Sequence, residues 1–191
     1  MKMTETKLKD VFIIEPEVRG DVRGWFMESY SDIKLQELGI NINFVQDNHA
    51  YNYKKGIIRG LHFQKSPKTQ TKLFRCTRGK LLDVVVDLRE GSPTYKQWLS
   101  IELSEDNKKQ LFIPKGFAHG YVTLTDEVEV QYKVDEYYAP NCERSIRFDD
   151  PEIGIIWGVE NAVLSEKDEK GVLLKDMDCK FVYGESPSYL E

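Results

Sequence analysis

The chain has 191 residues, of which 40% are hydrophobic and 31% charged, a composition typical of one ordinary globular domain. Its formal net charge of −5 gives no overall attraction for nucleic acid or an anionic membrane, so neither is an expected partner. The three cysteines, Cys76, Cys142 and Cys179, lie far apart without a CxxC pair, which argues against a disulfide scaffold or a zinc ribbon.

The N-terminal residues do not read as a targeting signal. MKMTETKLKD is polar, and the apolar run VFII that follows is too short for the hydrophobic region of a signal peptide. No segment approaches the roughly 20 apolar residues of a membrane span, so we expect a cytoplasmic protein. The segment DVFIIEPEV, residues 10–18, reads as a strand, and we expect it to pair with the sheet edge of a neighbouring subunit.

One helix is predicted early in the chain. Ser31 can cap it, Ile33, Leu35 and Leu38 supply apolar contacts, and Gly39 can end it.

From about Phe44 onward the pattern is one of short strands. Segments rich in Val, Ile, Tyr and Phe are separated by turn-forming residues, which favours an antiparallel sandwich or small barrel whose mouth can hold a ligand. The predicted strands are KLLDVVVDL, QWLSIEL, KQLFIP, GYVTLT, VEVQYKV and SIRF. In VEVQYKV, alternation places Tyr132 on the same face as Val128 and Val130, toward the interior of the barrel.

Neither an internal repeat nor a Pro/Gly/Ser-rich linker divides the chain. We therefore expect one domain, residues 1–191, with a barrel core at about 44–150. The N-terminal strand and helix, and a charged C-terminal strap, would pack on that core. Within the strap we expect Glu169 and Lys170 to be solvated.

The chain has only three histidines, and their contexts differ. His62 lies in IIRGLHFQ, beside Gly60 and Arg59, and His119 lies in FIPKGFAHGY, between turn-forming glycines. His49, in QDNHAYN, reads as a loop residue. No two of the three have the spacing that places metal ligands on one strand or helix face, so no metal site is predicted.

Basic residues stand near these motifs, and recognised catalytic motifs are missing. Arg23 and Arg59 lie in the glycine-containing segments DVRGWF and IRGLHF, which suit an arginine fork that binds phosphate. The sequence has no P-loop, no GxGxxG after a strand and no GxSxG elbow. Proton transfer by His, Tyr, Lys and carboxylate side chains is the chemistry that remains.

The chain resembles the dTDP-4-dehydrorhamnose 3,5-epimerase family over residues ~10 to ~170. The segments that carry the resemblance, in order, are DVRGWFMESY, FVQDNHAY, GIIRGLHFQ, QTKLFRCTRGKLLDVVVDLREGSPTYKQW, FIPKGFAHGYVTL, YKVDEYYAPNCERSIRFDDPEIGIIW and LSEKD. The resemblance implies an all-β, cupin-type jelly-roll barrel with short peripheral helices, a homodimer, and neither metal nor cofactor. It also implies the substrate dTDP-4-dehydro-6-deoxy-D-glucose, converted to dTDP-4-dehydro-L-rhamnose in dTDP-L-rhamnose biosynthesis.

The resemblance further implies four catalytic residues. His62 matches the general base, and Asp168 the carboxylate that orients this base. Lys72 matches the cation that stabilises the C4 oxyanion, and Tyr132 the acid on the opposite face of the sugar.

Other positions match the family's substrate-binding pattern. Arg23 and Arg59 would hold the diphosphate, and Gln46, Asn48 and Glu28 would contact thymidine or sugar. The full predicted binding set is Arg23, Phe26, Glu28, Gln46, Asp47, Asn48, Arg59, His119, Tyr138, Glu143 and Lys167.

Alternatives remain at this stage. The chain could epimerise a related dTDP-4-keto-6-deoxy sugar at C3 only or C5 only, because the base is shared and only ring presentation differs. A non-catalytic nucleotide-sugar-binding cupin would need the arginines but no base–acid pair. A metal-dependent cupin oxygenase is disfavoured by the histidine spacing.

Overall fold

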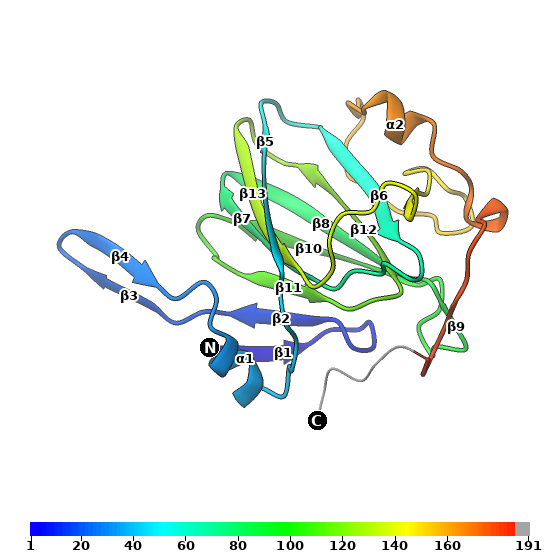
Figure 1. The fold of residues 1–191 in the computed structure, drawn as a ribbon. Coiled ribbons are helices and arrows are strands. Elements are labelled where there is room, and N and C mark those ends of the chain that lie inside the picture. The colour runs from blue at the N-terminus through cyan, green and yellow to red at the C-terminus, as the bar shows by residue number, and fades with distance from the viewer. Residues whose placement is uncertain (186–191) are drawn as a thin grey trace.

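The computed structural model describes residues 1–185 and consists mainly of two β-sheets that face each other (Figure 1). The first sheet has six strands with antiparallel pairing between neighbours. In spatial order its strands are β1 (Lys2–Glu5), β2 (Phe12–Glu15), β11 (Gln110–Ile113), β7 (Lys72–Arg78), β13 (Val128–Val134) and β5 (Gln46–Asn52).

The second sheet has five strands, also antiparallel. In spatial order they are β10 (Trp98–Ser104), β8 (Lys80–Asp87), β12 (Phe117–Thr123), β6 (Ile58–Gln64) and β14 (Glu143–Ser145). This architecture confirms the predicted all-β jelly-roll barrel with short peripheral helices. Among residues 1–185, no helix is both long and apolar enough to cross a membrane.

Smaller elements flank the two sheets. They are the hairpin β3 (Val18–Asp21) and β4 (Gly24–Met27), the helices α1 (Asp32–Glu37) and α2 (Glu166–Glu169), the 3₁₀ turn Leu174–Asp176, and the parallel pair β9 (Arg89–Glu90) and β15 (Phe181–Val182). The hairpin β3–β4 projects away from the barrel (Figure 1).

Both faces of the five-stranded sheet are apolar, which explains why the consecutive residues Val84, Val85 and Val86 of β8 are all hydrophobic. Val85 packs in the core between the sheets, whereas Val84 and Val86 pack on the outer face against Trp157 and neighbouring residues of the C-terminal segment. A strand covered on both faces loses the strict alternation of a half-exposed strand. Asp83 is therefore unusual as a fully buried carboxylate beside these three valines.

The N-terminal segment covers the outer face of the six-stranded sheet. Ser31 caps α1, as predicted, and Leu35 is buried against strands of that sheet, but Ile33 is exposed and makes no core contact. Residues 10–18 contain the predicted strand, β2. Its expected partner was wrong, however, because β2 pairs on both edges within its own chain, with β1 and β11.

The predicted strand SIRF begins earlier than expected. Strand β14 spans Glu143–Ser145, and Ile146, just beyond it, forms an isolated bridge to Val172 and exchanges backbone hydrogen bonds with Leu61.

The C-terminal strap, which is the segment after Trp157, is bonded to the rest of the domain at several points. Asp178 accepts hydrogen bonds from Lys65 and Arg144, which hold the pKa of its carboxyl well below its usual value. Further along, β15 pairs with β9. Nearer the start of the strap, α2 contacts β6.

Strands β6 and β12 approach each other closely at two glycines. A Cβ atom on Gly60 would lie 2.6 Å from the Cα of Gly120, and the φ of Gly60 is +125°. Only glycine fits both the spacing and the backbone conformation here. Beside this contact, His62 lies opposite His119 on the neighbouring strand.

Candidate active site

A cavity of about 220 Å³ opens between the two sheets. Polar and aromatic side chains from both sheets line it, together with residues of the loop after β13. The lining residues are Gln46, Asn48, Ala50, Arg59, His62, Phe63, Gln64, Gln70, Lys72, Phe74, His119, Tyr121, Tyr132, Tyr138 and Glu143.

His62, on β6, is paired with Asp168, on α2. The two lie 106 residues apart in the sequence, and His62 Nε2 is 2.5 Å from Asp168 Oδ1. Burial would raise the pKa of Asp168, but the hydrogen bond and charge of His62 lower it below its usual value, so Asp168 is a carboxylate. A carboxylate accepts a hydrogen bond from Nε2–H, so the ring nitrogen of His62 that can act as a base is Nδ1.

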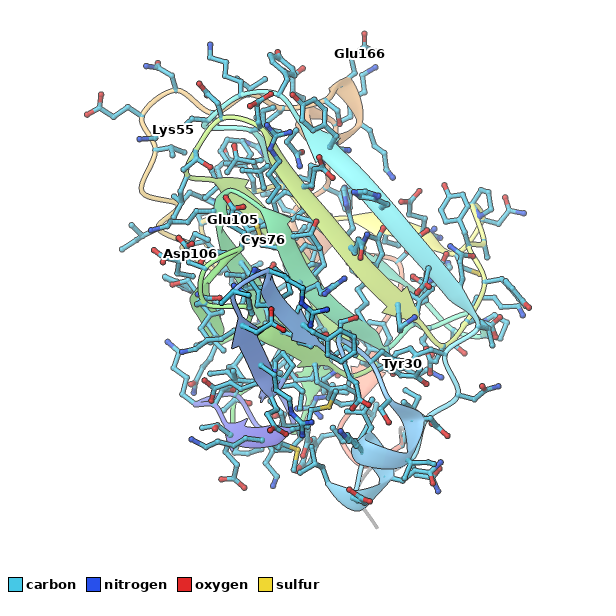
Figure 2. All side chains as sticks on the ribbon, turned by 90° about the vertical axis from the view of Figure 1, so that its left-hand side faces the viewer. Tyr30, Lys55, Cys76, Glu105, Asp106 and Glu166 are labelled. Carbon is cyan, nitrogen blue, oxygen red and sulfur yellow. The ribbon has the colours of Figure 1, made fainter. Side chains whose placement is uncertain are left out.

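A local residue sets where helix α2 begins. The side chain of Ser165 caps it by accepting a hydrogen bond from the backbone N–H of Asp168. This helix, which Glu166 marks in Figure 2, contacts β6. Asp168 is buried, whereas the two residues that follow it, Glu169 and Lys170, are exposed, as predicted for those two residues.

A second histidine–carboxylate pair lies next to the first. His119 Nε2 is 2.7 Å from Asp83 Oδ1, and both side chains are buried. His119 lines the cavity, whereas Asp83 lies behind it. Burial lowers the pKa of His119, so its imidazole is neutral.

Lys72, at the start of β7, brings a cation into the cavity. Its Nζ donates to the backbone carbonyl of His62 at 3.5 Å. Burial lowers the pKa of Lys72 to about 8, although the charges of Asp83 and Glu143 raise it. An ammonium group at the wall of this cavity stabilises negative charge that develops on a bound ligand.

Tyr132 reaches the cavity from the opposite sheet. As its alternation with Val128 and Val130 predicted, its side chain points inward, where its ring lies 5.6 Å from that of Phe74. Burial raises the pKa of Tyr132 above its usual value, although the charge of Arg59 opposes this effect. The phenol therefore keeps its proton near neutral pH.

The mouth of the cavity is bordered by a chain of polar contacts. Tyr138 Oη donates to Glu143 Oε2 at 2.8 Å, and Glu143 forms an ion pair with Lys167. Nearby, Gln46 Nε2 donates to Asn48 Oδ1 at 2.8 Å.

Arg59 is exposed at the same mouth and is oriented by neighbouring residues. Its Nε donates to Asn52 Oδ1 at 2.7 Å, and its Nη2 donates to the carbonyl of Tyr51 at 3.2 Å. The remaining guanidinium donors can bind an anionic ligand.

Three comparisons identify the family. The model of the family described as dTDP-4-dehydrorhamnose 3,5-epimerase matches residues 5–176. The dTDP-4-dehydrorhamnose 3,5-epimerase of Shigella flexneri is 46% identical over 179 residues, which are 93% of this chain and 98% of that protein. The chain belongs to the dTDP-4-dehydrorhamnose 3,5-epimerase family.

Solved structures of similar proteins agree with this assignment. The enzyme from Bacillus anthracis, crystallised with TDP and PPi, is 49% identical, with a TM-score of 0.88 over 90% of this chain and 98% of that one. The enzyme from Legionella pneumophila, in complex with dTDP-4-keto-L-rhamnose, is 43% identical, with a TM-score of 0.91 over 95% and 98% of the two chains. The protein is therefore an isomerase of the epimerase type.

The structure brings most of the residues that match the 3,5-epimerase pattern together. His62, Lys72 and Tyr132 line the cavity, and Asp168 and Lys167 join it through His62 and Glu143. The remaining matched residues that line it are Gln46, Asn48, Arg59, His119, Tyr138 and Glu143.

Besides Lys167, four predicted binding residues do not line this cavity. Arg23 pairs with Asp21 at the exposed tip of the hairpin, Phe26 is 68% exposed on β4, and Glu28 pairs with Lys34. Asp47 points to the outer face of the six-stranded sheet, where it accepts from Lys133 Nζ at 2.7 Å. Asp47 alternates with Gln46 and Asn48, so it cannot share their face.

Asp47 belongs instead to a separate hollow of about 290 Å³ on that outer face, which also contains Tyr30 and Arg75. Tyr30 is labelled in Figure 2, beside the strands of this sheet.

Several residues of the site were not predicted. Gln64 Oε1 accepts from the backbone N–H of Ala139, and its Nε2 donates to the carbonyl of Lys68, so it fixes the loop that carries Tyr138. Asp83 was missed as well. Its signal was available, because a carboxylate that interrupts the apolar run LLDVVV needs a buried partner.

Within residues 1–185, no group of three or more His, Cys, Asp or Glu side chains could hold a metal ion. His62 and His119 each use one ring nitrogen on a carboxylate instead.

Proposed function

We propose that this protein inverts C3 and C5 of dTDP-4-dehydro-6-deoxy-D-glucose to give dTDP-4-dehydro-L-rhamnose, in dTDP-L-rhamnose biosynthesis. One observation carries the proposal: the His62–Asp168 pair lies on the five-stranded side of the cavity, and Tyr132 faces it from the six-stranded sheet. Inversion at carbon needs a base and an acid on opposite faces of the sugar ring, and this arrangement supplies both.

The first step is removal of a proton next to the C4 ketone. The ketone acidifies the hydrogens on C3 and C5, because the electron pair left on carbon delocalises onto the ketone oxygen as an enolate. Nδ1 of His62 is the base, and the carboxylate of Asp168 stabilises the imidazolium that forms. Lys72 stabilises the negative oxygen on C4.

The second step is return of a proton to the other face. Tyr132 delivers its phenolic proton to C5, which completes inversion there. The phenol has the right protonation state for this role because burial raises its pKa. The enolate is the strongest base in the cavity at that moment, which drives the transfer.

The nucleotide portion binds at the mouth. Arg59 holds the diphosphate with the guanidinium donors that Asn52 and Tyr51 leave free. Gln46 and Asn48 supply polar contacts, and Tyr138 offers a half-exposed ring that can stack on a planar base. Glu143 and Lys167 fix Tyr138 through their shared hydrogen bond and ion pair.

Proton NMR in heavy water tests the proposed function. With dTDP-4-dehydro-6-deoxy-D-glucose, the enzyme is expected to introduce deuterium at both C3 and C5 and to give the L-rhamno product. Exchange at one carbon alone would identify a mono-epimerase. Tight binding of the sugar nucleotide without exchange would identify a binding protein.

The pKa of Lys72 predicts the alkaline side of the pH profile. Lys72 must be protonated to stabilise the oxyanion, and its pKa is about 8, so kcat/KM should fall as the pH rises through that value. Lys72→Arg keeps a positive charge at high pH and should remove this decline, at a cost in kcat from the different shape of guanidinium. Measurement of kcat/KM from about pH 6 to about pH 10 checks both expectations. An unchanged decline in Lys72→Arg would assign it to another group.

We further propose a homodimer in which the hairpin of one copy completes the cavity of the other. Arg23, Phe26 and Glu28 match the family's binding pattern but lie on or beside the projecting hairpin of their own chain (Figure 1). Its apolar side chains Val22 and Trp25 are exposed, as expected of a segment that docks on another surface. Within residues 1–185, strand β5, which carries Gln46 and Asn48, is the last strand of its sheet and has a partner strand on one edge only.

The dimer is expected to have a mass near twice 22.2 kDa by light scattering. A mixture of two inactive variants tests the exchange of hairpins. Arg23→Ala/Phe26→Ala retains its own His62, and His62→Asn retains its own hairpin, so a mixed dimer contains one intact site only if hairpins act on the partner. Recovery of activity in co-expressed mixed dimers is therefore expected. No recovery, or a monomeric mass, would contradict the exchange.

A further inference from the structure

Asp83 is a buried carboxylate that the proposed mechanism does not use. It lies in the middle of β8 and is completely inaccessible to solvent. Its Oδ1 is bonded to His119, but its Oδ2 has no hydrogen-bond partner among the described residues. A buried carboxylate with one oxygen left without a hydrogen bond is costly, so its place beside the cavity calls for a functional reason.

The contact with His119 gives the first part of that reason. Asp83 does not line the cavity, whereas His119 does, so any effect of Asp83 on a bound sugar passes through its neighbours. Because the imidazole of His119 is neutral, a carboxylate at Nε2 selects the tautomer with the proton on Nε2. Nδ1 of His119 then remains as a hydrogen-bond acceptor, suited to a hydroxyl group of the sugar.

Charge gives the second part. Burial raises the pKa of Asp83, and the proximity of His119 and Lys72 opposes that rise. In the other direction, Asp83 is the largest influence that raises the pKa of Lys72 against its burial. The ionisable groups around Lys72 come from five elements: His62 on β6, Asp83 on β8, His119 on β12, Glu143 on β14 and Lys167 on α2.

We propose that Asp83 is a positioning residue for the epimerisation. One carboxylate oxygen fixes the ring of His119 at the cavity wall, and the negative charge keeps Lys72 in its ammonium form. The inference rests on the proposed function, since the ammonium group is needed only if an oxyanion develops in the cavity. It assigns to the cavity two histidine–carboxylate pairs whose histidines lie on the neighbouring strands β6 and β12. The His62–Asp168 pair moves protons, whereas Asp83 orients His119 and favours the charged form of Lys72.

The test is Asp83→Asn, which keeps the volume and removes the charge. We expect kcat to fall roughly 10- to 100-fold, as for loss of a hydrogen bond to a charged group. We also expect the alkaline decline of kcat/KM to move to lower pH, because Lys72 loses an attractive charge. Asp83→Glu, which restores a carboxylate, should recover part of both. Wild-type kcat together with an unmoved pH profile in Asp83→Asn would overturn the proposal.

Asp150→Asn is the matched control. Asp150 is equally buried, but its carboxylate accepts from the backbone N–H groups of Glu152, Ile153 and Leu174, away from the cavity. This variant should lower the melting temperature and leave the pH profile unmoved. A similar shift of the profile in Asp150→Asn would mean that general loosening of the fold causes it, and would overturn the proposal.

A measurement on the unmodified protein decides the matter if Asp83→Asn does not fold. Nitrogen-15 NMR of the histidine rings, without substrate, should show His119 neutral with its proton on Nε2. A proton on Nδ1, or a protonated ring at neutral pH, would overturn the role given to Asp83. This readout does not depend on turnover, whereas absence of epimerisation by the wild-type protein would count against the proposed function alone.

Discussion

His62→Asn is expected to abolish exchange of both the C3 and the C5 hydrogens with solvent. One imidazole serves both carbons in the proposed mechanism, in which the free ring nitrogen of His62 is the base and the ionised carboxylate of Asp168 stabilises the imidazolium. Loss of a positioned general base typically costs about 10²- to 10⁴-fold in rate. Asparagine preserves a polar side chain at the cavity wall, so the substrate should still bind.

The same substitution at His49 provides the control. His49 lies on the outer face of β5, where its ring is half-exposed and bonds to Glu129 at 2.9 Å, so His49→Asn should keep both exchange reactions. Deuterium uptake at each carbon, followed by proton NMR, distinguishes the two variants. Persistent exchange at either carbon in His62→Asn would show that a different base acts there.

The elements of the fold were largely predictable from the sequence, because local patterns determine where most strands and the first helix form. VEVQYKV forms β13 over Val128–Val134, as its alternation predicted, and Ser31 caps the predicted helix. The boundaries of β14 and the pairing of β2 were not predictable, since strand partners are set by contacts distant in sequence. The exposure of Ile33 was not predictable either. Helix α1 is short, so it can expose one apolar residue and still keep its core contact at Leu35.

Individual residues of the site could be predicted from the sequence, but the pairings between them could not. The alternation of VEVQYKV predicted that Tyr132 points inward, and His62 was predicted from its match to the family pattern. The structure places both at one cavity. The pairing of His119 with Asp83 depends on the register of β8 and β12, which nothing in either strand specifies. Similarly, the sequence DVRGWF does not determine where the hairpin lies relative to the cavity, because that position depends on contacts with residues outside the hairpin.

Tyr132→Phe is expected to separate proton removal from inversion. The ring volume is kept, and the packing of the ring against Phe74 is retained, so the variant should fold and bind substrate. His62 would still remove protons, but the enolate would lack its acid on the opposite face, chiefly at C5. The product should then be the unchanged or mono-epimerised sugar, with deuterium returned from the face of His62. The measurement compares deuterium uptake with product stereochemistry in heavy water.

Tyr121→Phe is the matched control, since Tyr121 also lines the cavity and is packed against Phe74. Its hydroxyl bonds to Asn52, and burial raises the pKa of Tyr121 to about 12, which makes it a poorer proton donor than an ordinary phenol. Loss of this hydroxyl should therefore leave inversion at both carbons intact. Double inversion by Tyr132→Phe at the wild-type rate would instead return Tyr132 to a packing role. In that case the proton at C5 would have to come from water or from a group on another strand, because Phe74 and Val130 beside Tyr132 carry no exchangeable proton.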